Sequence, residues 1–293
     1  FHEFLLATGK PGLAEIIKAP PEKLSDTIHQ SLLNELRNYF FVGGMPECVE
    51  NFSSIGRMRN AFEIQHNLAD TFRQDFSKYA PFADKRCLNI VFSSVAKSIG
   101  RQIKYSHLSP DFSITTIKKA FELLRQAQVI RKIPAASPAG VPLEASASEK
   151  KFKALMLDIG IMQQLCGLPV DAEMHQADLL TIHKGAMAEQ FVGQEFVAVS
   201  ENDALNYWSR EEKSSTAEVD YLLSGKGRIY PVEIKSGSAG RLRSLHLLLN
   251  TYPECPYGIV LSTAPYAKLH DQKLVFLPIY YANQAGIDPG QFE

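Results

Sequence analysis

The sequence lacks any long run of apolar residues, and it has almost no excess charge of either sign. A helix needs roughly twenty mostly apolar residues to cross a bilayer, so we do not expect a membrane protein. Lysine and arginine number 31 and aspartate and glutamate 32, and the net charge of −1 excludes a uniform polycation but permits a local basic face. The 293 residues suffice for two or three domains with buried cores.

Several motifs that carry specific chemistry are also missing. The four cysteines lie far apart with no C-x-x-C pair, which is typical of reduced cytosolic thiols and not of disulfides or a zinc site. We therefore expect a cytoplasmic protein. The histidines show no H-E-x-x-H spacing and no G-x-S-x-G occurs, so zinc and serine hydrolases have no support. No G-x-x-x-x-G-K-[ST] phosphate loop occurs either, and we expect no ATP site in these residues.

What is present divides into three regions. Residues 1–85 carry helical periodicity, clearest over 22–41 and 56–79, and a glycine-rich turn at 43–46 separates the two stretches. Residues 86–174 predict a small helical module with a wing. Residues 175–293 alternate between helical and strand patterns, which predicts a mixed sheet with flanking helices.

The middle region contains a helical stripe followed by two short strands. Ser113 is placed to cap a helix with one apolar face. That face consists of Ile114, Ile117, Phe121 and Leu124. Strands over 129–133 and 152–157 bracket a loop rich in proline, alanine and serine, which suits a long flexible wing. Helices followed by such a hairpin predict a winged helix, whose last helix can enter a major groove.

This region also has a local excess of basic residues. Positions 101–133 hold two acidic residues and seven basic ones, namely Arg101, Lys104, Lys118, Lys119, Arg125, Arg131 and Lys132. The excess predicts salt-sensitive contact with DNA phosphates, with Lys118, Lys119 and Arg125 as candidates. A winged helix that contacts another protein, with solvated basic residues, fits the pattern nearly as well.

A β-hairpin is predicted in the third region. The apolar-rich runs 217–224 and 228–235 surround a short loop of glycine and lysine. With a two-residue loop, Asp220 falls opposite Glu233. Side chains alternate along a strand, so Glu233 and Lys235 share one face and the residues between them face the core. A three-residue loop would shift the register and turn Asp220 to the other face.

A helix is predicted over 184–199, before the hairpin. Its apolar arc consists of Ala188, Phe191, Val192, Phe196 and Val199. Glu189 lies at the edge of this arc. A helix that packs the arc on the hairpin would direct Glu189 toward the two hairpin carboxylates.

Carboxylates brought this close repel one another unless a divalent cation neutralises them, and oxygen ligands suit Mg²⁺ or Mn²⁺. Asp220 and Glu233 are the candidate direct ligands, and Glu189 is an additional or water-mediated ligand. Lys235 would orient the attacking water or stabilise developing negative charge. The alternative is a surface hairpin on which Glu233 and Lys235 are merely solvated, because isolated E-x-K triplets are common by chance.

The order of these residues, a helix glutamate, a strand aspartate and then EIK, resembles the PD-(D/E)XK nuclease superfamily, whose fold is that of restriction endonucleases. The phrases GAMAEQFVGQEF, LNYWSR, AEVDYLL and PVEIKSG are similar to the C-terminal domain of a large group of prokaryotic AAA+ ATP-binding proteins, a domain of unknown function of the 4143 class. Upstream, NYFFVGGMPECVENF and FRQDFSKYAP resemble the helical region that follows the ATPase core in those proteins.

The residue patterns and the resemblance together predict a chain with three parts, of the α/β and α classes. Residues 1–85 would be a helical lid or connector, residues 86–174 a winged helix, and residues 175–293 a restriction-endonuclease-like mixed sheet flanked by helices. Because the chain begins at Phe1 and has no phosphate loop, we expect a fragment that lacks the ATPase core.

The implied function is a Mg²⁺-dependent, DNA-binding nuclease module that hydrolyses phosphodiesters at Glu189, Asp220, Glu233 and Lys235. Arg241 and Arg243, near a predicted helix N-terminus, would contact the phosphate backbone. The alternative is a non-catalytic module that binds DNA or a protein and regulates the ATPase. The expected partners are DNA, the ATPase core of the same full-length protein and, in a homo-oligomer, other copies of the chain.

Overall fold

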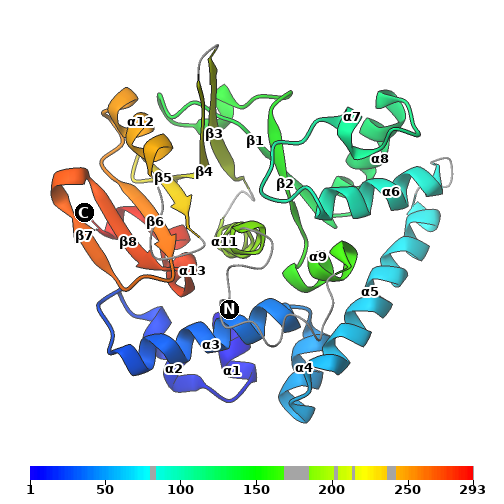
Figure 1. The fold of residues 1–293 in the computed structure, drawn as a ribbon, viewed down its shortest axis with the longest axis horizontal. Helices are drawn as coiled ribbons and strands as arrows, with labels where there is room; N and C mark the ends of the chain where they lie inside the picture. Colours follow the sequence, from blue (N-terminus) through cyan, green and yellow to red (C-terminus); the bar gives the residue numbers. More distant parts are fainter. Residues whose placement is uncertain (80–83, 168–184, 201–203, 213–214, 236–241, 293) are drawn as a thin grey trace.

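Helices form the first part of the chain and a mixed β-sheet forms the last part, with helix α11 (Ala186–Val199) between them (Figure 1). These elements are those of a computed structural model. The residues it describes are 1–79, 84–167, 185–200, 204–212, 215–235 and 242–292. Within these ranges no helix combines the length and the apolar character needed to cross a membrane.

The N-terminal helices α1 to α5 span His2–Ala7, Pro11–Lys18, Asp26–Val42, Pro46–Ile55 and Met58–Tyr79. The helix predicted over 22–41 begins later, at Asp26, where the side chain of Ser25 caps it by accepting from the backbone N–H of Ile28. The predicted turn at 43–46 is confirmed, because α3 ends at Val42 and α4 begins with Pro46, a residue suited to the first position of a helix.

The middle of the chain contains short helices and a two-stranded antiparallel sheet. Its elements are α6 (Lys85–Ala96), α7 (Tyr105–Leu108), α8 (Ile114–Gln126), β1 (Ile130–Pro134), the 3-10 helix η1 (Leu143–Ser146), β2 (Phe152–Met156) and α9 (Ile159–Cys166). The predicted cap is confirmed, since Ser113 Oγ accepts from the backbone N–H of Thr116 at 3.2 Å. Both predicted strands form within one residue of their expected ends.

The loop between β1 and β2 lies against the large sheet. The backbone N–H of Ala136 donates to the carbonyl of Tyr207 at 2.9 Å. Leu143 is buried in an apolar cluster that also contains Trp208. This loop was expected to be a flexible wing, but its contacts hold it on β3 (Asn206–Glu212). The two-stranded sheet is therefore fixed in position beside the larger one.

The last part of the chain forms the six-stranded sheet and its covering helices. Its elements are α11 (Ala186–Val199), β3, β4 (Ser215–Gly225), β5 (Arg228–Ile234), α12 (Arg243–Thr251), β6 (Gly258–Ser262), β7 (Ala267–Leu269), η3 (His270–Gln272), β8 (Leu274–Pro278), η4 (Ile279–Tyr281), α13 (Ala282–Ile287) and η5 (Pro289–Phe292). The strand order is β3-β4-β5-β6-β8-β7. Strands β3 to β5 pair antiparallel, β5, β6 and β8 pair parallel, and β7 is an antiparallel edge.

Two apolar clusters cover the two faces of this sheet. On one face, Phe191 and Phe196 of α11 are buried with Tyr221 and Val232. On the other face, the leucines of α12 are buried with residues of β4 and β6. Gly193 allows α11 to approach closely, because a Cβ there would lie 2.4 Å from the Tyr221 hydroxyl. Lys153 of β2 meets Glu189 and Asp220 at the α11 face.

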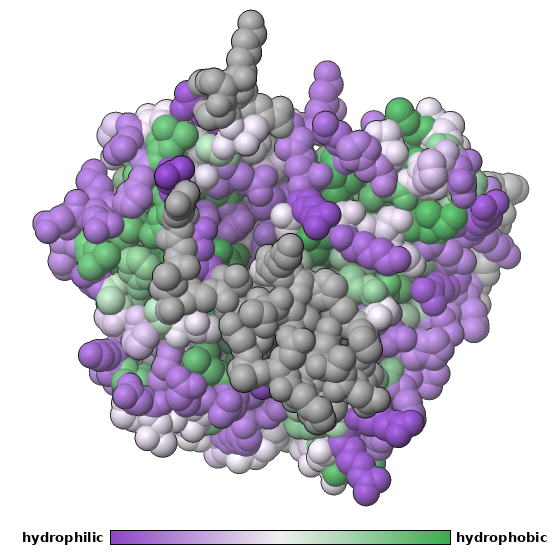
Figure 2. Space-filling view, viewed as in Figure 1, coloured by the Kyte–Doolittle hydropathy of each residue, from purple (hydrophilic) through white to green (hydrophobic). Residues whose placement is uncertain are grey.

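The predicted α/β class is confirmed as a helical N-terminal part followed by a mixed sheet with helices on its faces. The comparison with a winged helix and with a restriction endonuclease stays a prediction. Figure 2 shows that hydrophobic and hydrophilic residues are interspersed over α6 to α8, where Ile114 is 58% exposed. Helix α8 therefore presents an exposed face to solvent beside its buried stripe.

Candidate functional site

Helix α11 positions Glu189 at the junction of the sheet and β2. Four of the five residues of the predicted arc are buried, namely Ala188, Phe191, Val192 and Phe196, and Val199 is half-buried. The ring of Phe196 contacts that of Tyr221 edge-on, with 5.7 Å between centroids. Such packing fixes the helix, and Glu189 itself is only 8% exposed.

The β4–β5 hairpin has the register that the two-residue loop predicts. Lys226 and Gly227 both have positive φ, the geometry of a tight hairpin turn. Gly225 pairs with Arg228 and Tyr221 with Val232, so Asp220 and Glu233 are the next pair outward. Asp220 Oδ2 accepts from the backbone N–H of Ile234 at 2.8 Å, which ties its carboxylate to β5.

A bulge in β4 turns Asp220 toward α11. Across the β3–β4 pair, Asn206 faces Leu222 and Trp208 faces Val219, so two residues of β4, Asp220 and Tyr221, lie opposite one residue of β3. Val219 and Leu222 belong to the apolar cluster beneath α12, whereas Tyr221 belongs to the cluster beneath α11. The extra residue lets Asp220 reach the α11 side as well, where it meets Lys153 of β2.

Lys153 is the central group of the site. Its side chain is 2% exposed, and its Nζ lies 2.8 Å from Glu189 Oε1, 2.6 Å from Glu218 Oε1 and 3.6 Å from Asp220 Oδ1. The ammonium also lies 5.2 Å from the ring centroid of Tyr207, a cation–π contact. One lysine thus brings a helix carboxylate and two strand carboxylates around a single positive charge.

Two glutamines of α11 hold the end of β2 and the start of α9 against that helix. The side chain of Gln190 accepts from the backbone N–H of Met156 and donates to its carbonyl, both at 2.9 Å. Gln194 Oε1 accepts from the backbone N–H of Ile159 at 3.1 Å. These bonds satisfy buried backbone groups, and they fix the strand that delivers Lys153.

Glu233 and Lys235 form a second pair on β5. Lys235 Nζ lies 2.6 Å from Glu233 Oε1, so the two side chains share one face as predicted. Glu233 is 8% exposed, and its other oxygen, Oε2, is buried with no hydrogen-bond partner. A buried carboxylate oxygen without a partner is costly, and it marks a position where a further positive group fits.

Charge is unbalanced across the site. Four carboxylates, Glu189, Glu218, Asp220 and Glu233, face two ammonium groups, Lys153 and Lys235. Burial, with the charge of Asp220 adding to it, raises the pKa of Glu233 to about 8 although Lys235 opposes the shift. Burial raises the pKa of Glu189 to about 7 against the attraction of Lys153.

Lys153 itself is kept charged. Burial lowers the pKa of Lys153, but the combined attraction of Glu189, Asp220 and Glu218 outweighs burial and leaves it above the ordinary lysine range. When all six groups are ionised, the cluster therefore carries a net charge of −2. Either protons on carboxylates or a divalent cation would balance it.

A divalent cation fits at only one end of the site, the end formed by Asp220 and Glu233. Asp220 and Glu233, which follow the last printed pair of the hairpin register, supply carboxylate oxygens of the kind that Mg²⁺ or Mn²⁺ accepts, including the unpartnered Oε2 of Glu233. Glu189 does not join them, because its carboxylate is engaged by Lys153. In the described ranges no group of three or more histidine, cysteine, aspartate or glutamate side chains is arranged to hold a metal ion. The predicted three-carboxylate arrangement thus reduces to a pair.

Lys153 and Glu218 were not predicted from the sequence. Glu218 could have been found, because it precedes Asp220 by two residues and shares its side of the strand. Lys153 gave a weaker signal, a single lysine within the apolar run FKALM. A lone lysine in a strand is ordinarily read as solvent-exposed, and nothing local shows that it faces carboxylates from another part of the chain.

The predicted nucleic-acid contacts lie away from this cluster. Lys118, Lys119 and Arg125 are exposed on α8. Arg125 is paired with Glu122, whose Oε2 accepts from its Nε at 2.7 Å. Arg243 is exposed at the first residue of α12, and Arg241 lies outside the described residues.

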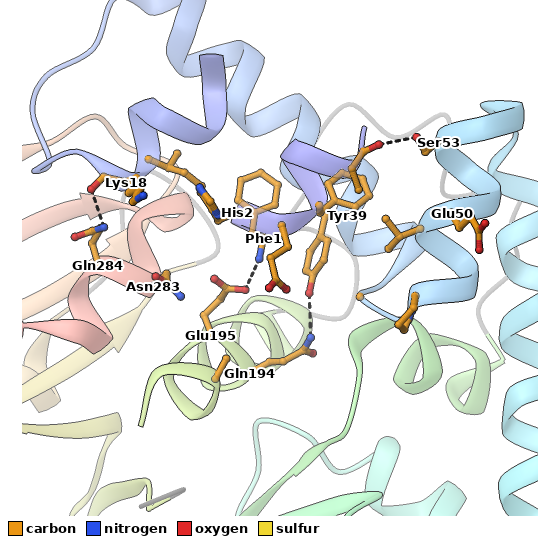
Figure 3. A pocket seen from close by; sticks show the side chains of 18 of the residues that line it. Phe1, His2, Lys18, Tyr39, Glu50, Ser53, Gln194, Glu195, Asn283 and Gln284 are labelled. Atoms are coloured by element: carbon orange, nitrogen blue, oxygen red, sulfur yellow. Dashed lines mark hydrogen bonds and ion pairs between the residues drawn. The ribbon is translucent and has the colours of Figure 1, made fainter. Parts of the chain in front are cut away.

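A large cavity lies elsewhere, bordered by α1, α4, α11 and α13 (Figure 3). Its volume is about 900 Å³. Several polar groups in it already have partners, since Glu195 accepts from the Phe1 amine at 2.7 Å and Gln194 donates to the Tyr39 hydroxyl at 3.0 Å. None of the four predicted catalytic residues is among the described residues that line it. The cavity and the acidic cluster are separate features.

Two family models match the chain, and both describe domains of unknown function. Residues 33–172 match DUF8612, and residues 184–281 match DUF4143. The first match contains Lys153, and the second contains all four predicted catalytic residues. No curated protein matches the chain, and no solved structure matches it.

Proposed function

We propose that residues 184–281 hydrolyse phosphodiester bonds of DNA at Asp220, Glu233 and Lys235, with one bound Mg²⁺ or Mn²⁺. The observation that carries the proposal is the buried, unpartnered Oε2 of Glu233 beside Asp220 and Lys235. Two adjacent carboxylates with a lysine on the same strand provide ligands for a cation and a positive group beside it. The match to DUF4143 agrees with the resemblance of this region to that domain class, and the nuclease chemistry rests on the residues of the site.

The roles of the chain's own residues follow from their contacts. Asp220 and Glu233 would hold the cation, which when bound activates water and stabilises charge on the phosphate. The N–H of Ile234 fixes the Asp220 carboxylate before any ligand binds. Lys235 orients Glu233 and places a positive charge where a phosphate oxygen would gain negative charge. Preorganised charges of this kind need no rearrangement during the reaction.

The proposal is tested by incubating the protein with supercoiled, linear and single-stranded DNA in Mg²⁺ or Mn²⁺. Wild type should cut at least one of them, and Asp220→Ala and Lys235→Ala should not. Exposed residues provide the matched controls Asp271→Ala and Lys23→Ala, which should cut like wild type. Cutting that survives in both site variants would come from a contaminant and would refute the proposal.

The second candidate is a non-catalytic DNA-binding module that regulates the AAA+ ATPase that the sequence resembles. The exposed face of α8 favours it, because Lys118 and Lys119 lie there beside the exposed Ile114 while Ile117 and Phe121 are buried. A helix of this kind can place basic side chains along a DNA backbone. Binding without cutting in the preceding experiment would select this candidate.

The double variant Lys118→Ala/Lys119→Ala should weaken DNA binding at all sequences. Each lysine that contacts a phosphate adds nearly one unit to the slope of log affinity against log salt, so the slope should become shallower by about 2. Fluorescence anisotropy with a labelled duplex at several salt concentrations measures it. An unchanged slope would show that α8 does not contact DNA, and Lys23→Ala should leave the slope unchanged in either case.

A further inference from the structure

The cation position among Glu189, Glu218 and Asp220 already holds a positive charge that belongs to the chain. Nuclease sites with two metal ions place both between carboxylates and phosphate oxygens. Here the Lys153 ammonium occupies the space between the three carboxylates, within 2.8 Å of the two glutamates. We propose that Lys153 is a built-in cation that replaces one of two divalent ions, so that the site takes a single Mg²⁺ or Mn²⁺ at Asp220 and Glu233.

This inference rests on the proposed function, because that function defines the second cation position. Three features indicate that Lys153 is a permanent part of the site. Its side chain is 2% exposed, so the ammonium depends on the surrounding carboxylates, and not on water, for its hydrogen bonds. The ring of Tyr207 covers the ammonium at 5.2 Å. The side chain of Gln190, the residue after Glu189, hydrogen-bonds to both the backbone N–H and the carbonyl of Met156, and so holds the strand that carries Lys153.

Asp220 connects the built-in cation to the open position. Its Oδ1 lies 3.6 Å from Lys153 Nζ, and its Oδ2 is fixed by Ile234 next to Glu233. One carboxylate therefore has one oxygen toward Lys153 and the other held at the backbone of β5, the strand that carries Glu233. Glu233 Oε2, buried and without a partner, is the oxygen left for an added ion.

The arrangement also joins the two regions that match different families. Lys153 lies in the part matched by DUF8612, and the carboxylates lie in the part matched by DUF4143. The first region thus supplies a positioning residue for the site of the second. A phosphodiester site in residues 184–281 alone would carry an uncompensated charge, and it would need a second divalent ion where Lys153 now lies.

The test is to count the Mn²⁺ ions bound by wild type and by Lys153→Met, using the EPR signal of free Mn²⁺. Methionine keeps the length of the side chain and removes its charge, so the variant should bind one more ion per chain than wild type. Adding Glu189→Gln to Lys153→Met should abolish the extra ion. Equal numbers in wild type and Lys153→Met would overturn the inference.

The outcomes separate the inference from the proposed function. One ion in wild type and two in the variant support both. No ion in wild type and one in the variant support the built-in cation but contradict a cation at Asp220 and Glu233. If Lys153→Met does not fold, Mn²⁺ should restore its folding, and Lys153→Gln, which can still donate to the carboxylates, is measured in parallel. Failure of both variants to fold at any Mn²⁺ concentration would overturn the inference, because a vacant cation position should be filled.

Discussion

Asp220→Ala and Lys235→Ala should both remove cation-dependent cleavage of DNA, for different reasons. In the proposed site Asp220 is a cation ligand, so its loss removes that ligand and leaves the Ile234 N–H without its acceptor. In the proposed mechanism Lys235 acts on charge that develops in the transition state, and the loss of one such donor of the oxyanion-hole type slows catalysis by about 100- to 1000-fold. The measurement is the initial rate of cutting at saturating Mn²⁺.

Two further variants separate chemistry from folding in this experiment. Lys235→Arg keeps the charge but changes its shape, and it should retain more activity than Lys235→Ala. Asp220→Asn keeps the acceptor for the Ile234 N–H, so it should preserve stability better than alanine while losing activity equally. A fully active Asp220→Asn variant would show that this carboxylate binds no cation.

Lys153→Met should destabilise the fold by about 3–5 kcal/mol near pH 8, because it leaves buried carboxylates without their counter-charge. The matched control is Lys132→Met on the neighbouring strand. Lys132 is half-buried and contacts the Phe152 ring at 4.8 Å, so its loss should cost about 1 kcal/mol or less. Urea unfolding followed by circular dichroism measures both values.

The loss in Lys153→Met should depend on pH. In wild type the pKa values of Glu189 and Glu233, about 7 and about 8, lie above those of unfolded glutamate, so the folded state binds more protons. These two groups therefore make their full contribution to the free energy of unfolding below about pH 4. The contribution falls as the pH rises through the pKa values that the groups have in the folded state. Without Lys153 the carboxylates bind protons more tightly still, and the variant should lose less stability at pH 5.5 than at pH 8.

A variant that is equally unstable at both pH values would point to lost packing as the cause. Added Mn²⁺ should raise the stability of wild type and should do so more at pH 8 than at pH 5.5, because protons compete for the same oxygens.

Much of the site could be predicted because it depends on local rules. The short loop of Lys226 and Gly227 fixed the hairpin register, and the register fixed which side chains lie across from each other. The apolar arc of α11 likewise predicted which face would meet the sheet, and so where Glu189 would lie.

What could not be predicted depends on distant parts of the chain. Lys153 is 36 residues from Glu189 in sequence, and its strand reads like any short apolar strand with one polar position. The bulge at Asp220 and Tyr221 has no clear turn residue to mark it. Together these two features decide that Glu189 pairs with a lysine, where the sequence alone predicted a metal ligand.

The most direct test of the proposed cation site is the binding of Mn²⁺ to wild type and to Glu233→Gln. Glutamine preserves the size of the side chain and removes the charge, so the fold should tolerate it. Isothermal titration calorimetry should show one saturable Mn²⁺ per chain in wild type and none in Glu233→Gln. A wild-type chain that binds no Mn²⁺, or a Glu233→Gln variant that binds it as tightly as wild type, would contradict the proposed cation site.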